Sequence, residues 1–107
     1  MIEVKAVIRP NKLPALRTAL LDIPEFPGMT VTKVEGCSAP SKTNKTNIKE
    51  ELTDYSAKVR VEIVCNDEIA EVIMNRIVTI CQTGQVGDGV VWCTEVPKAF
   101  FISKTSS

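Results

Sequence analysis

The amino-acid sequence predicts an α+β fold in which two helices pack on one face of an antiparallel sheet. Two observations lead to this prediction. Apolar and polar side chains alternate in two short segments, as in half-buried strands, and a third segment is rich in threonine and valine. Apolar residues recur every three or four positions in two others, as in amphipathic helices. The chain has 107 residues, the length of one domain. We therefore expect residues 1–107 to form a single domain.

The first half of the sequence predicts a strand, a helix and a second strand. Apolar residues alternate with charged ones over residues 2–8. Leucines and an isoleucine then recur at helical spacing over 13–23, with Asn11 as the expected N-cap and Pro14 in the first turn. Residues 29–35 are rich in threonine and valine, which favours a strand.

The second half predicts a strand, a helix and a last strand. Residues 58–65 alternate in polarity, and residues 69–80 carry apolar side chains at helical spacing. Gly84 is placed to end this helix. A fourth strand is expected over 90–96, and residues 99–102 are expected to add a short edge strand.

The resulting βαββαβ order is that of the ferredoxin-like fold. Its helices cover only one face of the sheet. Trp92 and other apolar residues on the open face would be buried most simply by oligomerisation. Many unrelated activities use this fold, so function has to be argued from particular residues.

The composition excludes several classes of function. The 13 basic and 13 acidic residues cancel, which leaves no basic stripe for nucleic acid or for an anionic membrane surface. The chain has no histidine, which removes imidazole catalysis and histidine-ligated metals. No apolar run approaches the roughly 20 residues that span a bilayer, and the N-terminus lacks a secretory signal pattern. We expect a soluble cytoplasmic protein that is not an enzyme.

Four cysteines are widely spaced and form no C-x-x-C motif. Cys65, Cys81 and Cys93 lie in apolar segments, where we expect reduced, small hydrophobic side chains. Cys37 stands at the entrance to a polar loop, where we expect an exposed thiol. That loop, at about 37–56, has too few apolar residues to offset its ordering entropy, and we expect it to be mobile. A functional loop and a merely disordered one fit this composition equally well.

The glycine-rich stretch Thr83–Gly89 joins the second helix to the last strand. Three glycines in this stretch allow backbone N–H groups to converge on a concave turn of the kind that binds phosphate. By itself, the same stretch is better explained by a helix C-cap followed by a tight turn.

This stretch resembles the nucleotide-binding turn of the PII signal-transduction family, which usually reads Thr-Gly-(Lys/Gln)-Ile-Gly-Asp-Gly-Lys. Residues 6–13, 28–36 and 58–64 are similar to the family's first helix start and its first three strands, in the same order. The sequence is thereby identified as a member of this family over about residues 2–97. The resemblance implies a homotrimer that binds an adenine nucleotide, and no other cofactor, between adjacent subunits.

By this resemblance the nucleotide-site residues are Val7, Thr30, Gly36, Cys37, Ser38, Lys58, Val64, Gly87, Asp88, Gly89 and Val90. The strand residues among them would surround the base and ribose, and the glycine-rich turn would face the phosphates. Taken singly, Val7, Thr30 and Val64 are also consistent with ordinary strand packing. No catalytic residue and no metal ligand is implied.

The sequence departs from the family pattern where the family places cations and a loop glutamine. Val90 stands at the lysine after the last glycine, Phe101 and Ser103 at two arginines, and Ala39 and Pro40 at the arginine and glutamine of the loop. Each lost cationic contact to phosphate removes about 1.5–3 kcal/mol of binding free energy. We therefore expect ADP or AMP to bind at least as well as ATP. Compensation by Lys98 or Lys104 stays an open alternative.

These departures are less typical of nitrogen sensors than of PII-like proteins associated with inorganic-carbon uptake or carboxysomes. That likeness implies a small anion such as bicarbonate as second effector, and a membrane transporter or carbon-metabolism protein as partner. The pathway, carbon or nitrogen, stays open. The alternative is a metal-binding or structural trimer like the divalent-cation-tolerance proteins, with Cys37 as a thiolate ligand.

Overall fold

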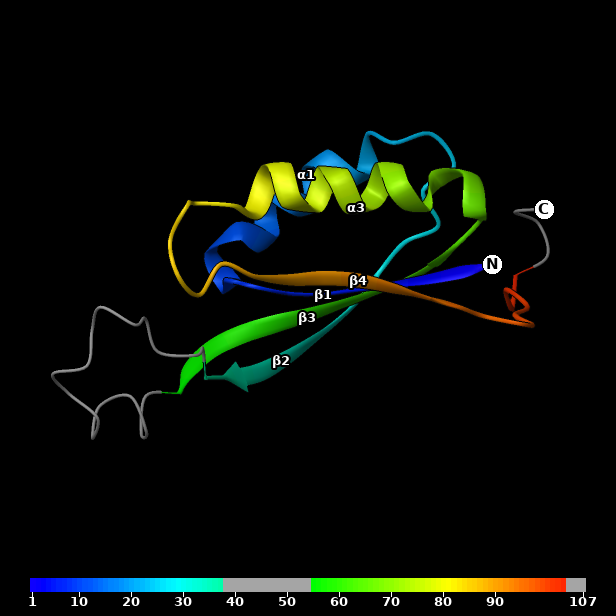
Figure 1. The fold of residues 1–107 in the computed structure, drawn as a ribbon. Coiled ribbons are helices and arrows are strands. Elements are labelled where there is room, and N and C mark those ends of the chain that lie inside the picture. Colours follow the sequence, from blue (N-terminus) through cyan, green and yellow to red (C-terminus); the bar gives the residue numbers. More distant parts are fainter. Residues whose placement is uncertain (38–54, 104–107) are drawn as a thin grey trace, which may run out of the picture.

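The computed structural model describes residues 1–37 and 55–103 (Figure 1). The strands in this part of the chain are β1 (Ile2–Ile8), β2 (Thr30–Gly36), β3 (Ser56–Cys65) and β4 (Gly89–Glu95). The helices are α1 (Leu13–Leu21) and α3 (Asp67–Cys81), with a 3-10 helix η1 (Pro10–Lys12) directly before α1. This order confirms the predicted βαββαβ, ferredoxin-like fold.

The four strands form one antiparallel sheet in the order β2-β3-β1-β4. The central strands β1 and β3 place Val7 opposite Arg60, and β4 places Val90 opposite Val7 on the other side. Both α-helices lie over the same face of the sheet, and no described segment covers the other face (Figure 1). The sheet therefore has one helix-covered face and one open face.

The core lies between the helices and the covered face of the sheet. Because side chains alternate along a strand, every second residue of β1 and β3 points to this face. The apolar residues that this packing buries are Val4, Ala6, Ile8, Leu16, Leu20, Ile23, Val59, Val61, Ile63, Cys65, Ala70, Ile73, Ile77 and Cys81. Among the described residues, neither helix has the length and apolar character that crossing a membrane requires.

Three sequence-based expectations about element ends were wrong. Asn11 does not cap α1, because η1 intervenes and Lys12 holds the N-cap position without a side-chain hydrogen bond. α3 ends at Cys81, three residues before Gly84, because Gln82 already has extended backbone. Residues 99–102 form no strand, since ladder pairing beyond β4 stops after the hydrogen bond from Val96 N–H to the Met1 carbonyl.

The cysteines follow their positions in the sheet and helices. Cys65 and Cys81 are buried as expected, and burial raises the pKa of both thiols because it disfavours the thiolate. Cys93 was expected to be buried and is exposed instead, because β4 is an edge strand with a neighbour on one side only. Cys37 is exposed, as its place after β2 predicted.

A pair of neighbouring substitutions on α3 tests this description of the core. Ile73 is fully buried, whereas Val72 is about half exposed on the same helix. Ile73→Ala should lower the free energy of unfolding by about 2–5 kcal/mol, and Val72→Ala by less than about 1 kcal/mol. Urea denaturation at one fixed protein concentration measures both. Equal losses for the two variants would contradict the assigned helix face.

Candidate functional site

The predicted site residues lie at two opposite ends of the sheet. Gly36, Lys58 and the turn that precedes β4 lie at one end, which we call the turn end. Thr30 and Val64 lie at the other end. Lys58 and Val64 are six residues apart on β3, a separation of about 20 Å. One subunit therefore does not bring the two groups together around one ligand.

At the turn end, the carboxylate of Asp88 holds the turn between α3 and β4. Its Oδ2 accepts hydrogen bonds from the backbone N–H groups of Thr83 (2.7 Å) and Gly84 (3.0 Å). Its Oδ1 accepts from the Thr83 hydroxyl and from Arg9 Nε (3.2 Å). One side chain thus ties together the start of the turn, its end and the residue that follows β1.

These hydrogen bonds hold the pKa of Asp88 well below the usual range for an aspartate. The Thr83 hydroxyl makes the largest contribution and the Thr83 backbone N–H the next, because both bind the charged form more strongly than the neutral one. The carboxylate already accepts hydrogen bonds from the N–H groups of Thr83 and Gly84, so these two groups are not available to a phosphate. Within the described residues, the N–H groups of Val86, Gly87 and Asp88 itself donate no hydrogen bond, so they stay available for a ligand.

Arg9 adds a second link between β1 and the turn. Besides its contact with Asp88, it donates a hydrogen bond from Nη2 to the Val86 carbonyl at 2.9 Å. Sequence reasoning missed Arg9. The signal that identifies it is the register, because Ile8 pairs with Gly89 and Arg9 must then lie beside the turn.

Lys58 is the buried cation of the turn end. Its side chain is almost fully enclosed, and its Nζ donates a hydrogen bond to the Gly87 carbonyl. Gly36 lies against its stem, because a β carbon built on Gly36 would be 3.2 Å from Lys58 Cγ. An ammonium has three N–H donors, and this contact uses one. The turn end therefore brings together three predicted residues, Gly36, Lys58 and Gly87.

Gly89 is required by the close approach of the turn to β1. Its φ is +112°, and a β carbon at this position would lie 1.8 Å from the Val7 carbonyl oxygen. Gly84 also has positive φ, at +80°, but a β carbon there would meet nothing within 4 Å. Gly89 is thus required both by its backbone conformation and by the lack of space for a side chain, whereas Gly84 is required by its backbone conformation alone.

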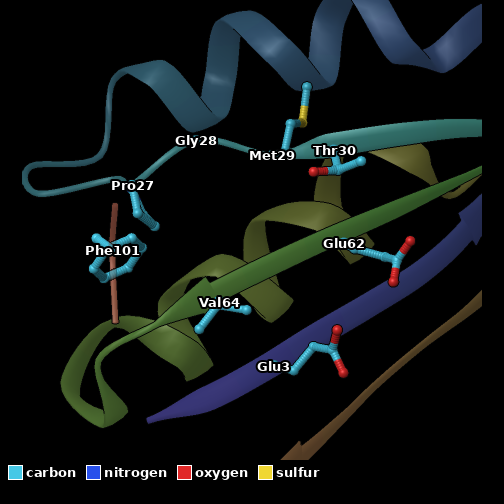
Figure 2. Close-up of a pocket in the computed structure, with 8 residues that line it drawn as sticks. All are labelled: Glu3, Pro27, Gly28, Met29, Thr30, Glu62, Val64 and Phe101. Carbon is cyan, nitrogen blue, oxygen red and sulfur yellow. The ribbon is translucent and has the colours of Figure 1, made fainter. Parts of the chain in front are cut away.

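At the opposite end, the open face carries a cavity of about 580 Å³, which we call the Glu3–Phe101 cavity (Figure 2). Its volume lies in the range of small-molecule sites. Its lining residues are Glu3, Pro27, Gly28, Met29, Thr30, Glu62, Val64 and Phe101. Of the predicted residues, only Thr30 and Val64 belong to it. In Figure 2 the Phe101 ring lies beside Pro27, and the two carboxylates lie across the strands from it.

The two carboxylates of the cavity are each paired along their own strand. Glu3 lies 3.6 Å from Lys5 Nζ, and Glu62 lies 3.6 Å from Arg60 Nε. Both distances are too long for good hydrogen bonds, so the oxygens keep their capacity to accept from a ligand. Sequence reasoning missed both residues. Strand pairing reveals them, because Glu3 is opposite Val64 and Glu62 is opposite Thr30.

Comparison with known proteins assigns the family. The family model described as "Nitrogen regulatory protein P-II" matches residues 1–106. The chain belongs to the P-II family. It is 34% identical over 103 residues to nitrogen regulatory protein P-II of Klebsiella oxytoca and to nitrogen regulatory protein P-II 1 of Escherichia coli (strain K12), covering 95% of this chain and 91% of each relative. The resemblance that the sequence motifs indicated is thus confirmed, and the chain is a member of a signal-transduction regulatory family.

The remaining predicted residues of this P-II chain lie at the turn end or outside the described residues. Val7 and Val90 form a cross-strand pair at the turn end, next to the Ile8–Gly89 pair, with Val90 largely exposed. Cys37 follows β2 at the turn end, and Ser38 lies outside the described residues. Across residues 1–37 and 55–103, no group of three or more histidine, cysteine, aspartate or glutamate residues is placed to hold a metal ion.

The residues that replace the cations expected from the resemblance to the P-II family lie in different parts of the chain. Phe101 lines the cavity at the end of the sheet opposite to the turn. Ser103 is exposed. Ala39 and Pro40, like Lys104 and most of the predicted loop at 37–56, lie outside the described residues, although Ser56 already belongs to β3.

Paired alanine substitutions test the packing of the turn against β1. Gly84→Ala should cost about 1–2 kcal/mol, because only its left-handed backbone is strained. Gly89→Ala should cost at least about 2 kcal/mol more, because its β carbon also meets the Val7 carbonyl. Urea unfolding provides the comparison. Equal costs would show that the turn does not approach β1 as described.

The depressed pKa of Asp88 predicts an unusual resistance of the turn to acid. A group whose pKa is lowered by folding contributes stability above its unfolded value, near 3.9 for aspartate, and loses it only as the pH falls through the lower folded value. The amide proton shift of Gly84 in NMR spectra should therefore stay constant from pH 7 to about pH 4. In Asp88→Asn this amide should lose its downfield shift at every pH. A wild-type titration midpoint near the ordinary aspartate value would contradict the assignment.

Proposed function

We propose that this protein is a cytoplasmic, non-enzymatic P-II regulator that binds an adenine nucleotide between the subunits of a homotrimer. ADP or AMP is favoured over ATP. The observation that supports a shared site is the separation of its two halves. The Glu3–Phe101 cavity and the turn end lie about 20 Å apart on the same sheet. If the cavity of one subunit faces the turn of the next, one nucleotide contacts both.

A head-to-tail arrangement closes into a ring when the rotation between neighbours closes, and in this proposal it closes with three subunits. It also covers the open face, where Val90 and Trp92 remain partly exposed in a single chain. Burial of such apolar side chains supplies the driving force for assembly. Each subunit then gives its cavity to one neighbour and its turn to the other, so a ring of three has three equivalent sites.

The choice of nucleotide follows from the donors at the turn end. The N–H groups of Gly87 and Asp88 and the buried Lys58 suit one or two phosphates. Val90 supplies no charge where the family has a lysine, and Phe101 lies in a cavity with two carboxylates. The γ-phosphate of ATP thus gains little in exchange for its lost hydration.

The second effector is a small anion such as bicarbonate, bound beside the nucleotide. Lys58 supports this assignment because it keeps two N–H donors after its contact with the Gly87 carbonyl. In this proposal the loop at 37–56, most of which lies outside the described residues, passes the response to a transporter or a carbon-metabolism protein. Ordering of a segment is an established form of switching.

Calorimetry with ATP, ADP and AMP tests the nucleotide preference. ADP or AMP should bind at least as tightly as ATP, with dissociation constants nearer micromolar than nanomolar. Gly87→Val should abolish binding, because the side chain blocks the phosphates and the residue has φ +95°. Gly84→Ala is the control with positive φ at the far side of the turn, and it should bind normally. Much tighter binding of ATP would overturn the assignment.

Sedimentation velocity tests the assembly independently of ligand. The wild-type protein and Gly87→Val should both sediment as trimers at micromolar concentration, because the open face and not the turn supplies the apolar contact. A stable monomer would remove the shared site from this account.

A further inference from the structure

Phe101 is the aromatic wall of the Glu3–Phe101 cavity. It follows β4 in a segment without regular structure, and of the lining residues it alone is aromatic. Its neighbours in the segment behave differently, because Phe100 and Ile102 do not line the cavity and are much more exposed. In Figure 2 the ring stands beside Pro27, on the side of the cavity away from the two carboxylates.

The lining divides this cavity into an apolar side and an acceptor side. Phe101, Pro27 and Val64 provide apolar surface, and Glu3 and Glu62 provide carboxylate oxygens. Within residues 1–37 and 55–103, no lysine or arginine lines it. A phosphate placed here would meet two carboxylates, while the cations beside them, Lys5 and Arg60, do not line the cavity. A flat, uncharged ring with N–H or O–H donors at its edge would instead match both sides.

Lys5 and Arg60 keep the surroundings of the cavity close to neutral. Each pairs with one of the two carboxylates along its own strand. The cavity therefore does not call for a cationic ligand to balance its charge. The matching ligand is neutral and rich in donors, as are the base and ribose of a nucleoside.

We propose that Phe101 stacks on the base of the bound nucleotide and sets the specificity of this cavity for the nucleoside part of the ligand. The inference rests on the proposed function and deepens it. At a position where the family has a cation for phosphate, this chain has a ring for the base. Recognition then depends less on the number of phosphates, and the nucleoside adenosine itself becomes a ligand.

Stacking of a base on an aromatic side chain gives a measurable loss when the ring is removed. Phe101→Ala should weaken adenosine, AMP and ADP alike by about tenfold, because the ring contacts the part that they share. Phe101→Tyr keeps the ring and should bind as wild type does. Phe100→Ala removes an adjacent exposed ring and should leave every affinity unchanged.

Calorimetry of the full chain with adenosine, AMP, ADP and ATP separates the outcomes, and sedimentation checks that each variant keeps the wild-type assembly. Phe101→Leu replaces Phe101→Ala if the latter does not assemble, since leucine keeps apolar contact without a ring. A uniform loss with rescue by tyrosine supports the proposal. If wild type binds ADP and Phe101→Ala binds it equally well, or loses only ATP, the stacking role is wrong and the proposed function stands. If wild type binds no adenine nucleotide, the proposed function fails and this inference with it.

Discussion

The hydrogen bonding of the Asp88 carboxylate is the interaction on which the site most depends. Four donors from Thr83, Gly84 and Arg9 converge on it, so the turn has a fixed shape before any ligand arrives. A turn that is already ordered loses less conformational entropy when a ligand binds. Because Arg9 continues from β1, the shape of the turn is also tied to the central strand of the sheet. Gly87 and Asp88 can then present backbone N–H groups at set positions.

The sheet imposes the second constraint, which is the distance between the turn end and the cavity end. β3 carries Lys58 near its start and Val64 near its end, and a rigid strand cannot shorten that distance. The chain therefore holds two half-sites of different character. The turn end offers backbone donors and a buried ammonium, whereas the cavity end offers an aromatic ring and carboxylate acceptors. In the proposed function, these two ends bind one nucleotide, with the phosphates at the first and the nucleoside at the second.

Periodicity predicted the fold well because it reports local burial. The four strands and two helices appear where the side-chain pattern and composition placed them, within a few residues. It could not show contacts between distant positions, such as the bond from Arg9 to Val86, or the approach of Glu3 to Val64. The family motif identified Gly89 and Lys58 without giving their physical roles, which are close approach to Val7 and a hydrogen bond to Gly87. Exposure of Cys93 also escaped prediction, because strand order within the sheet decides which strand is the edge.

A subunit-mixing experiment tests most directly whether the two half-sites meet across an interface. Gly87→Val disables the turn, and Val64→Trp fills the cavity. The two variants, co-expressed with different tags, are purified as mixed trimers. A shared site predicts that neither variant binds ADP alone, and that each mixed trimer regains one site, where an intact cavity meets an intact turn. If mixed trimers bind no ADP although wild type does, each site lies within a single subunit and the account is wrong.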